Sequence, residues 1–209
     1  MPSRAALRHA PTPPARMTVA EFIEWYPDDH AGGPWQLVDG EPVAMAPASL
    51  THGALQNEAG RLIGNHLAER GGPCRAIANP GIVPRVRARE NWRIPDLGVT
   101  CDPADAGYEM AHPVLLVEVL SPTNHAETRA NIWAYTTLPS VVEILVLHTA
   151  RPEAEVLRRR PDGSWPESPE VVGAGGTVAL DSLGFAAPLA AFYRTTGLAA
   201  EAAGPPPPG

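Results

Sequence analysis

The 209-residue sequence contains no lysine, so arginine supplies all 16 of its basic side chains. This absence excludes every mechanism that needs a lysine from the chain. Arginine cannot take over as a proton donor or acceptor, because its pKa lies above ~12. Abundant alanine, proline and arginine without lysine is typical of a GC-rich coding sequence.

Cysteine is almost as scarce. Cys74 and Cys101 are far apart and form no CxxC motif. A single disulfide is the alternative, but we predict two free thiols in a reducing cytoplasm. No apolar run approaches the ~18 residues that span a membrane, and residues 1–16 lack the apolar segment of a secretory signal. These absences predict a cytoplasmic protein that does not enter a membrane.

Positive charge is also in deficit, since the formal net charge is −7. A domain that binds nucleic acid through bulk charge has a pI above ~9, so any such contact here must come from a local patch. One set of arginines is the candidate contact stripe, with solvated strand faces as the alternative: Arg85, Arg87, Arg89, Arg93 and residues 158–160.

The pattern of apolar residues predicts one domain over 17–197, with flexible tails at 1–16 and 198–209. Helices are expected at 19–25, 51–70, from Asn124 to Pro139, and at 189–195. Strands are expected at 35–38 and 41–45 (a hairpin around Asp39-Gly40), 74–78, 81–88, 92–100, 113–120, 141–148 and 153–160. The strand–helix–strand unit 113–148 predicts a parallel pair, and hence an α/β fold with a mixed sheet.

Two carboxylates stand out against this background. Glu118 interrupts the apolar run Val114–Leu120, which is typical of a strand buried on both faces. An ionised side chain there must be paired, bound to a metal, or protonated. Asp96 lies in the strand expected at 92–100, directly before Leu97-Gly98-Val99-Thr100. If the two strands are neighbours, both carboxylates converge on one divalent cation.

Carboxylate oxygens on adjacent strands suit Mg²⁺ or Mn²⁺ rather than Zn²⁺. Such an ion polarises a phosphodiester and lowers the pKa of a bound water, which is the basis of metal-assisted hydrolysis. The residues alone leave an alternative open, in which a buried Glu118 pairs with an arginine such as Arg93.

Several motifs together resemble one known family. They are PASLTH (47–52), RIPDLGV (93–99), PVLLVEVLSP (113–122), a following helix with Tyr135, and EILV (143–146). Their order is similar to that in the Uma-two family of putative restriction endonucleases, a branch of the PD-(D/E)xK nuclease superfamily. The similarity spans roughly residues 17–195.

The resemblance implies a restriction-endonuclease-like core of helix, three antiparallel strands, helix and strand, preceded by the hairpin. It implies that Asp96 and Glu118 are the metal carboxylates, with the Val119 carbonyl a further ligand. DNA is the implied substrate and a homodimer the implied assembly.

The chain departs from the family pattern at its lysines. The superfamily has a lysine two residues after the glutamate, where this chain has Leu120. The Uma-two group carries one in the next helix, where this chain has Asn131, with Glu127 at the place of an upstream aspartate. Asn131 can orient a water by hydrogen bonding but brings no charge. His52 and, as the alternative, His125 are candidate bases.

Three functions follow for testing. The first is a Mg²⁺- or Mn²⁺-dependent DNA endonuclease that uses Asp96, Glu118, Asn131 and His52. The second, favoured by the missing lysine and the net charge, is a catalytically weak or inactive module of the same fold that binds nucleic acid or a protein partner. Hydrolysis of another phosphate ester is a third.

Overall fold

The computed structural model describes residues 16–25 and 34–204. Almost all of the expected tail 1–16, and the last residues of the tail expected at 198–209, lie outside the described residues. The centre of the fold is a six-stranded sheet in the order β3-β4-β5-β6-β7-β8. Its strands are β3 (Arg75–Ala78), β4 (Leu97–Thr100), β5 (Pro113–Leu120), β6 (Glu143–His148), β7 (Ala154–Arg158) and β8 (Glu170–Val172).

The sheet is mixed, as the strand–helix–strand pattern predicts. β3, β4 and β5 pair antiparallel, and β5 then pairs parallel with β6. The crossover between β5 and β6 is α3 (His125–Tyr135). This order of three antiparallel strands, a helix and a strand confirms the fold expected from the motifs.

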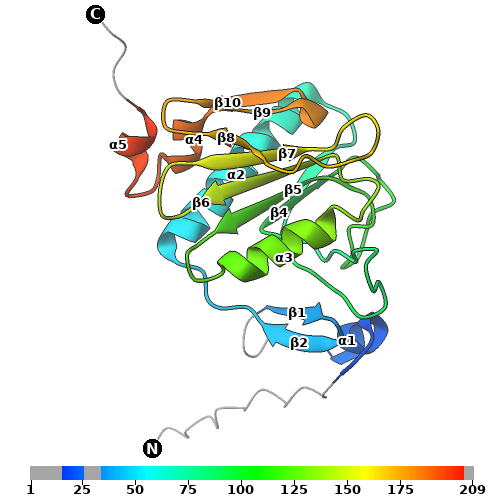
Figure 1. Cartoon of the computed structure of the whole chain (residues 1–209). Coiled ribbons are helices and arrows are strands. Elements are labelled where there is room, and N and C mark those ends of the chain that lie inside the picture. The colour runs from blue at the N-terminus through cyan, green and yellow to red at the C-terminus, as the bar shows by residue number, and fades with distance from the viewer. Residues whose placement is uncertain (1–15, 26–33, 205–209) are drawn as a thin grey trace, which may run out of the picture.

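Helices cover both faces of the sheet (Figure 1), with α2 (Leu50–Arg70) on one side and α3 on the other. Because β5 and β6 are covered on both faces, their sequences are almost continuously apolar. Alternate β5 residues enter different cores: Leu115, Val117 and Val119 pack with α2, whereas Leu116 and Leu120 pack with α3. The same alternation turns Glu118 toward α3.

The expected hairpin forms a separate unit beside the sheet (Figure 1), made of β1 (Trp35–Val38) and β2 (Glu41–Ala44). Asp39 and Gly40 have φ angles of 50° and 86°, as a tight two-residue turn requires. The hairpin and α1 (Val19–Trp25) share a small core with Trp92 and Ile94. Leu37 and Trp92 exchange two backbone hydrogen bonds of 2.9 Å, which fasten the hairpin to the segment that leads into β4.

The strand predicted at 81–88 is wrong. Only Gly81 and Ile82 make isolated bridges, and residues 85–90 form turns, with Arg87 at a φ of 45°. Pro80 and Pro84 bracket the short bridged piece, and a proline has no N–H to give to a sheet. The alternation of arginines therefore does not mark a strand face.

The predicted arginine stripe is wrong for Arg93, Arg158 and Arg159. Arg93 is buried, and Arg158 pairs with Glu143 and Glu170. Arg159 donates to backbone carbonyls and lies 5.1 Å from the Trp165 ring centroid. These three arginines are held by the fold, whereas Arg85, Arg87 and Arg89 are exposed and a contact role for them stays a prediction.

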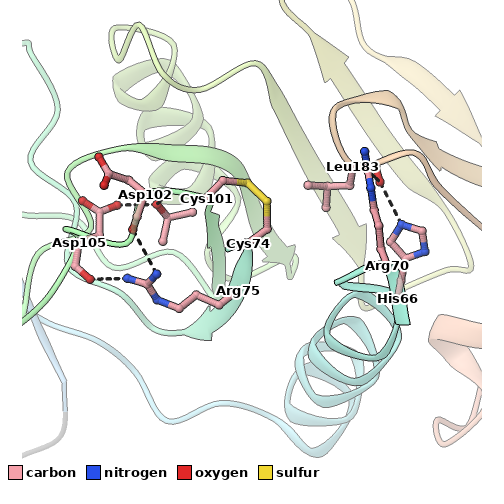
Figure 2. The surroundings of a disulfide bond; sticks show 9 residues. His66, Arg70, Cys74, Arg75, Cys101, Asp102, Asp105 and Leu183 are labelled. Atoms are coloured by element: carbon pink, nitrogen blue, oxygen red, sulfur yellow. Dashed lines mark hydrogen bonds between the residues drawn. A yellow bond between two sulfur atoms is a disulfide. The ribbon is translucent and has the colours of Figure 1, made fainter. Parts of the chain in front are cut away.

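The prediction of two free thiols is also wrong, because Cys74 and Cys101 form a disulfide (Figure 2) with sulfurs 2.00 Å apart. Arg75 pairs with Thr100 in the β3–β4 register, so the cysteines face each other one residue beyond that pair. Arg75 donates to the carbonyl oxygens of Asp102 and Asp105 and so supports the loop that follows. Sequence spacing gives no sign of this contact, because it depends on the register of two strands.

Loss of the disulfide is expected to destabilise the protein. The bridge closes a loop with a sequence separation of 27, and such a cross-link contributes about 3 kcal/mol by restricting the unfolded chain. A Cys74→Ser/Cys101→Ser double variant should lower the free energy of unfolding by about this amount in urea titrations. Wild-type protein treated with a reductant should behave like the variant. Equal unfolding midpoints for oxidised wild type and variant would contradict the assignment.

The chain after β8 adds a second small sheet, β9 (Thr177–Leu180) with β10 (Phe185–Pro188), and the helices α4 (Leu189–Tyr193) and α5 (Ala199–Ala202). Helix α5 falls in the segment expected to be a tail: Ala202 is buried, and its carbonyl accepts a 3.0 Å hydrogen bond from Gly175. Within the described part of the chain, no helix combines the length and apolar character needed to cross a membrane.

Candidate metal and active site

A cavity of about 740 Å³ lies where the hairpin, the beginnings of α2 and α3, and the sheet come together. Its lining includes all four side chains predicted to be catalytic: His52, Asp96, Glu118 and Asn131. The chain brings these residues together from four separate segments. Their shared location agrees with a common site and leaves their roles as predictions.

Strand pairing places the two carboxylates side by side. Leu97 pairs with Val117 in the antiparallel β4–β5 register, so Asp96 and Glu118 stand opposite each other one position further along. Both are buried, with exposed fractions of 6% and 5%. The Val119 N–H donates to Oδ2 of Asp96 over 2.6 Å, which ties the β5 backbone to this carboxylate.

Helix α2 fixes Asp96 from the other side. Nε2 of His52 lies 2.7 Å from Oδ1 of Asp96, and Gln56 donates to the Asp96 carbonyl over 2.8 Å. Ser49 caps the helix by accepting from the His52 N–H at 3.2 Å. This cap fixes the start of α2 and so the position of His52 in its first turn. With Nε2–H donating to the carboxylate, Nδ1 of His52 is the ring nitrogen left to accept a proton.

Helix α3 holds Glu118. The Tyr135 hydroxyl donates to Oε1 over 2.7 Å, and the Asn131 amide approaches the same oxygen at 3.4 Å. Burial raises the pKa of Glu118 well above its usual value, and the negative charge of Asp96 raises it further, whereas the two hydrogen bonds lower it. Burial, with the nearby Glu118 charge, also raises the pKa of the Tyr135 hydroxyl. Two adjacent buried carboxylates resist joint ionisation until a cation joins them.

Two further cavity residues, Gln36 and Glu127, are not among the site residues predicted from the sequence, although Glu127 stands at a position of the family pattern. Gln36 on β1 is 1% exposed; its Oε1 accepts from the Ile94 N–H at 3.3 Å, and its Nε2 donates to Glu127 at 2.9 Å. Glu127 on α3 thereby becomes a third carboxylate on the cavity wall. The polar Gln36 at an inward position of a short strand was a detectable signal, but nothing indicated which element it would meet.

The alternative of a Glu118–Arg93 ion pair is absent from the described residues. The Arg93 guanidinium instead donates to the amide oxygens of Asn131, at 3.2 Å, and Asn91, at 2.9 Å. Arginine therefore does not neutralise Glu118 by direct contact.

The donor set fits a hard divalent cation. Asp96 and Glu118 offer oxygens from opposed positions, and no described residue donates a hydrogen bond to Oε2 of Glu118. A cation would also relieve the repulsion that raises the Glu118 pKa. Val119 does not line the cavity through its side chain, which lies in the core, and its carbonyl as a ligand stays a prediction.

Two other groups have ligand-like spacing: Asp102, Asp105 and His112, and His148, Glu153 and Glu155. Their acids are already engaged. Asp105 accepts from Thr100 and from backbone N–H groups of the following loop, and Glu155 accepts two hydrogen bonds of 2.6 Å from Arg129. These groups support the fold around the site.

Glu155 on β7 fastens α3, which carries Asn131 and Tyr135, to the sheet. Burial opposes ionisation of Glu155, but hydrogen bonds from Arg129 and His148 hold its pKa down to about 2. Its folded pKa is therefore depressed from 4.5, so the stabilisation is present above about pH 4.5 and is lost as the pH falls toward about 2.

Glu155→Gln is expected to lower the free energy of unfolding at pH 7 by roughly 3 kcal/mol, the equivalent of that pKa shift. The gap from wild type should narrow between pH 4.5 and pH 3 in urea titrations. Glu153→Gln is the control, since Glu153 pairs with the exposed Arg151 and should cost less than about 1 kcal/mol. A gap for Glu155→Gln that does not depend on pH would contradict the assignment.

Residues 19–190 match the family described as Uma2, putative restriction endonuclease. An uncharacterized protein of Synechocystis sp. is 28% identical over 163 residues, which cover 76% of this chain and 83% of that protein. The crystal structure of a putative nuclease belonging to DUF820 from Anabaena variabilis has a similar fold, with a TM-score of 0.68 and 15% identity. The matched region covers 85% of this chain and 98% of that chain.

Proposed function

The chain belongs to the Uma2 family of putative restriction endonucleases, the Uma-two family that its motifs resemble, and from this premise we propose that it is a DNA endonuclease that uses Mg²⁺ or Mn²⁺ bound by Asp96 and Glu118. One observation carries the proposal. The two carboxylates are buried, stand opposite each other directly before β4 (Asp96) and on β5 (Glu118), and line one cavity without an arginine contacting either of them.

Each site residue has a defined task in this proposal. Asp96 and Glu118 hold the ion, which when bound supplies Lewis-acid polarisation of the phosphodiester. The His52 imidazole and the Val119 N–H keep the Asp96 carboxylate in place. Nδ1 of His52 can accept the proton of the attacking water, and the Asn131 amide can orient that water beside Glu118.

The proposal is tested first by metal dependence. Purified full-length protein should convert supercoiled plasmid to open-circular or linear forms in Mg²⁺ or Mn²⁺, and EDTA should abolish the conversion. Readdition of Mn²⁺ should restore it. Cleavage that continues in EDTA, or no cleavage in either metal at any protein concentration tested, would overturn the proposal.

A second candidate is a nuclease-fold module that binds without cutting. It is favoured by the two missing lysines, since Leu120 is 3% exposed in an apolar cluster and Asn131 is neutral. DNA or protein binding that survives EDTA, together with no cleavage, is the expected outcome for such a module.

Assembly as a homodimer and a cytoplasmic location are parts of this proposal that rest on the family and on composition. The Cys74–Cys101 disulfide is an argument against a cytoplasmic location, because disulfides are rare in that reducing compartment. Sedimentation of the purified protein tests the dimer, and trapping of thiols in intact cells tests the redox state.

A further inference from the structure

Arg93 is the basic side chain nearest the core of the site, and its burial is unusual for an arginine. It lies just before β4, where its backbone exchanges two 2.8 Å hydrogen bonds with Ile82, and only 7% of the residue is exposed. Its guanidinium meets two neutral amides, on Asn131 and Asn91, and its Nε is buried without a hydrogen-bond partner.

No carboxylate among residues 16–25 and 34–204 lies within ion-pair distance of this guanidinium. Burial lowers the pKa of Arg93, whereas the charges of Asp39, Glu127 and Glu118 oppose this shift from beyond ion-pair distance, and an arginine keeps its proton at neutral pH. A buried charge without a direct ion pair is costly to the fold. This cost has a functional explanation if the charge acts electrostatically on groups bound in the neighbouring cavity.

The contact with Arg93 fixes the orientation of the Asn131 amide. A guanidinium has only donors, so the amide must turn its oxygen toward Arg93. Its NH₂ group is then left toward Glu118, in agreement with the 3.4 Å approach of Nδ2 to Oε1. Without Arg93, the amide would be oriented only by its long 3.4 Å contact with the Glu118 carboxylate.

Arg93 thus influences the cavity through Asn131. The donor end of Asn131 faces the cavity, and the positive charge of Arg93 lies directly behind it. A fixed positive field is what stabilises the negative charge that develops on a phosphoryl group during hydrolysis. In a chain with no lysine, Arg93 is the described cation placed to provide that field from within the core.

We propose that Arg93 is a positioning residue of this site: it orients the Asn131 amide toward Glu118 and supplies, from behind that amide, the positive charge that no lysine provides. The inference rests on the proposed metal-dependent nuclease function. It concerns how the substrate phosphate is stabilised and assigns Arg93 no contact with the substrate.

The test measures Mn²⁺ affinity and cleavage together in full-length Arg93→Met, Arg93→Lys and the exposed control Arg85→Met. Neutralising Arg93 removes repulsion of the dication, so Arg93→Met should bind Mn²⁺ about 3- to 10-fold more tightly in calorimetric titrations. The same variant should cleave plasmid about 10²-fold more slowly, mainly through kcat. Arg93→Lys keeps the charge and should keep the wild-type Mn²⁺ affinity, with part of the cleavage rate.

A purely structural Arg93 would give the opposite pattern, because a disordered site binds Mn²⁺ more weakly. Weaker or unchanged Mn²⁺ binding in Arg93→Met, or an unchanged cleavage rate, would overturn the inference. If the wild type does not cut DNA, the nuclease proposal fails. The Mn²⁺ titrations still test whether the positive charge of Arg93 acts on an ion bound in the cavity. Circular dichroism checks folding, and Arg93→Gln is the second neutral variant if Arg93→Met does not fold.

Coupling to Asn131 is tested by a double-mutant cycle. Asn131→Ser should slow cleavage by an amount comparable to Arg93→Met, and the double variant should be little slower than either. Additive losses would show that Arg93 does not act through Asn131 and would overturn the orienting part of the inference.

Discussion

Glu118→Gln is expected to lower the metal-dependent cleavage rate at least about 10³-fold and to weaken Mn²⁺ binding at the same time. The substitution keeps the shape of the side chain and an oxygen that can accept from Tyr135. It removes one of the two carboxylate charges that hold the ion, and with it the polarisation that drives phosphodiester hydrolysis. Single-turnover cleavage and Mn²⁺ titration measure the two effects.

The control for this variant is Glu69→Gln, an exposed acid near the end of α2, which should cleave and bind metal like wild type. A Glu118→Gln variant that cuts as fast as wild type would remove Glu118 from the site. The stability of the variant provides an independent check. A raised pKa in the folded state means that ionised Glu118 destabilises the metal-free protein above pH 4.5, and that the penalty grows until the pH passes the folded pKa. Glu118→Gln should therefore unfold at a higher temperature than metal-free wild type at pH 7.

Gly81→Val should be among the most destabilising single changes in the chain, with a loss on the order of 4 kcal/mol in the free energy of unfolding. A Cβ atom at Gly81 would lie 1.8 Å from Cζ2 of Trp92 and 2.4 Å from Cε2. Trp92 is 5% exposed and its ring packs in the core that α1 shares with the hairpin, so moving it aside would disturb that core.

Gly64→Ala is the matched control, because a Cβ at this position in α2 meets nothing within 4 Å. Removing a glycine from a helix interior stabilises by up to about 1 kcal/mol, so the two variants should change stability in opposite directions. Urea titrations measure both. A Gly81→Val protein as stable as wild type would mean that the Trp92 ring does not cover this glycine.

Sequence patterns predict correctly those features that depend on neighbouring residues along the chain. Glu118 is conspicuous because it breaks an apolar run, and β5 is indeed buried along most of its length. The parallel β5–β6 pair follows from a strand–helix–strand pattern, and the hairpin follows from Asp39-Gly40. In each case neighbouring residues along the chain carry the signal.

The predictions that are wrong concern features set by contacts between residues far apart in the sequence. Alternating arginines predict a strand at 81–88, but Pro80, Pro84 and the turn that follows limit the pairing to Gly81 and Ile82. The disulfide depends on the β3–β4 register, and the contact of Gln36 with Glu127 joins residues 91 positions apart. Arg93 was interpreted as a partner for Glu118 or as a surface contact, because its position relative to Asn131 depends on how α3 packs on the sheet.

The hairpin has a consequence for how this chain can change over evolutionary time. It forms one side of the cavity through Gln36, yet it pairs with no strand of the six-stranded sheet. The carboxylates are held by α2, α3, β4 and β5, which do not depend on the hairpin for their strand pairing. The structure thus separates one wall of the cavity from the strand pairing that aligns the two carboxylates. Substitutions on the hairpin can reshape that wall while the carboxylates stay in register.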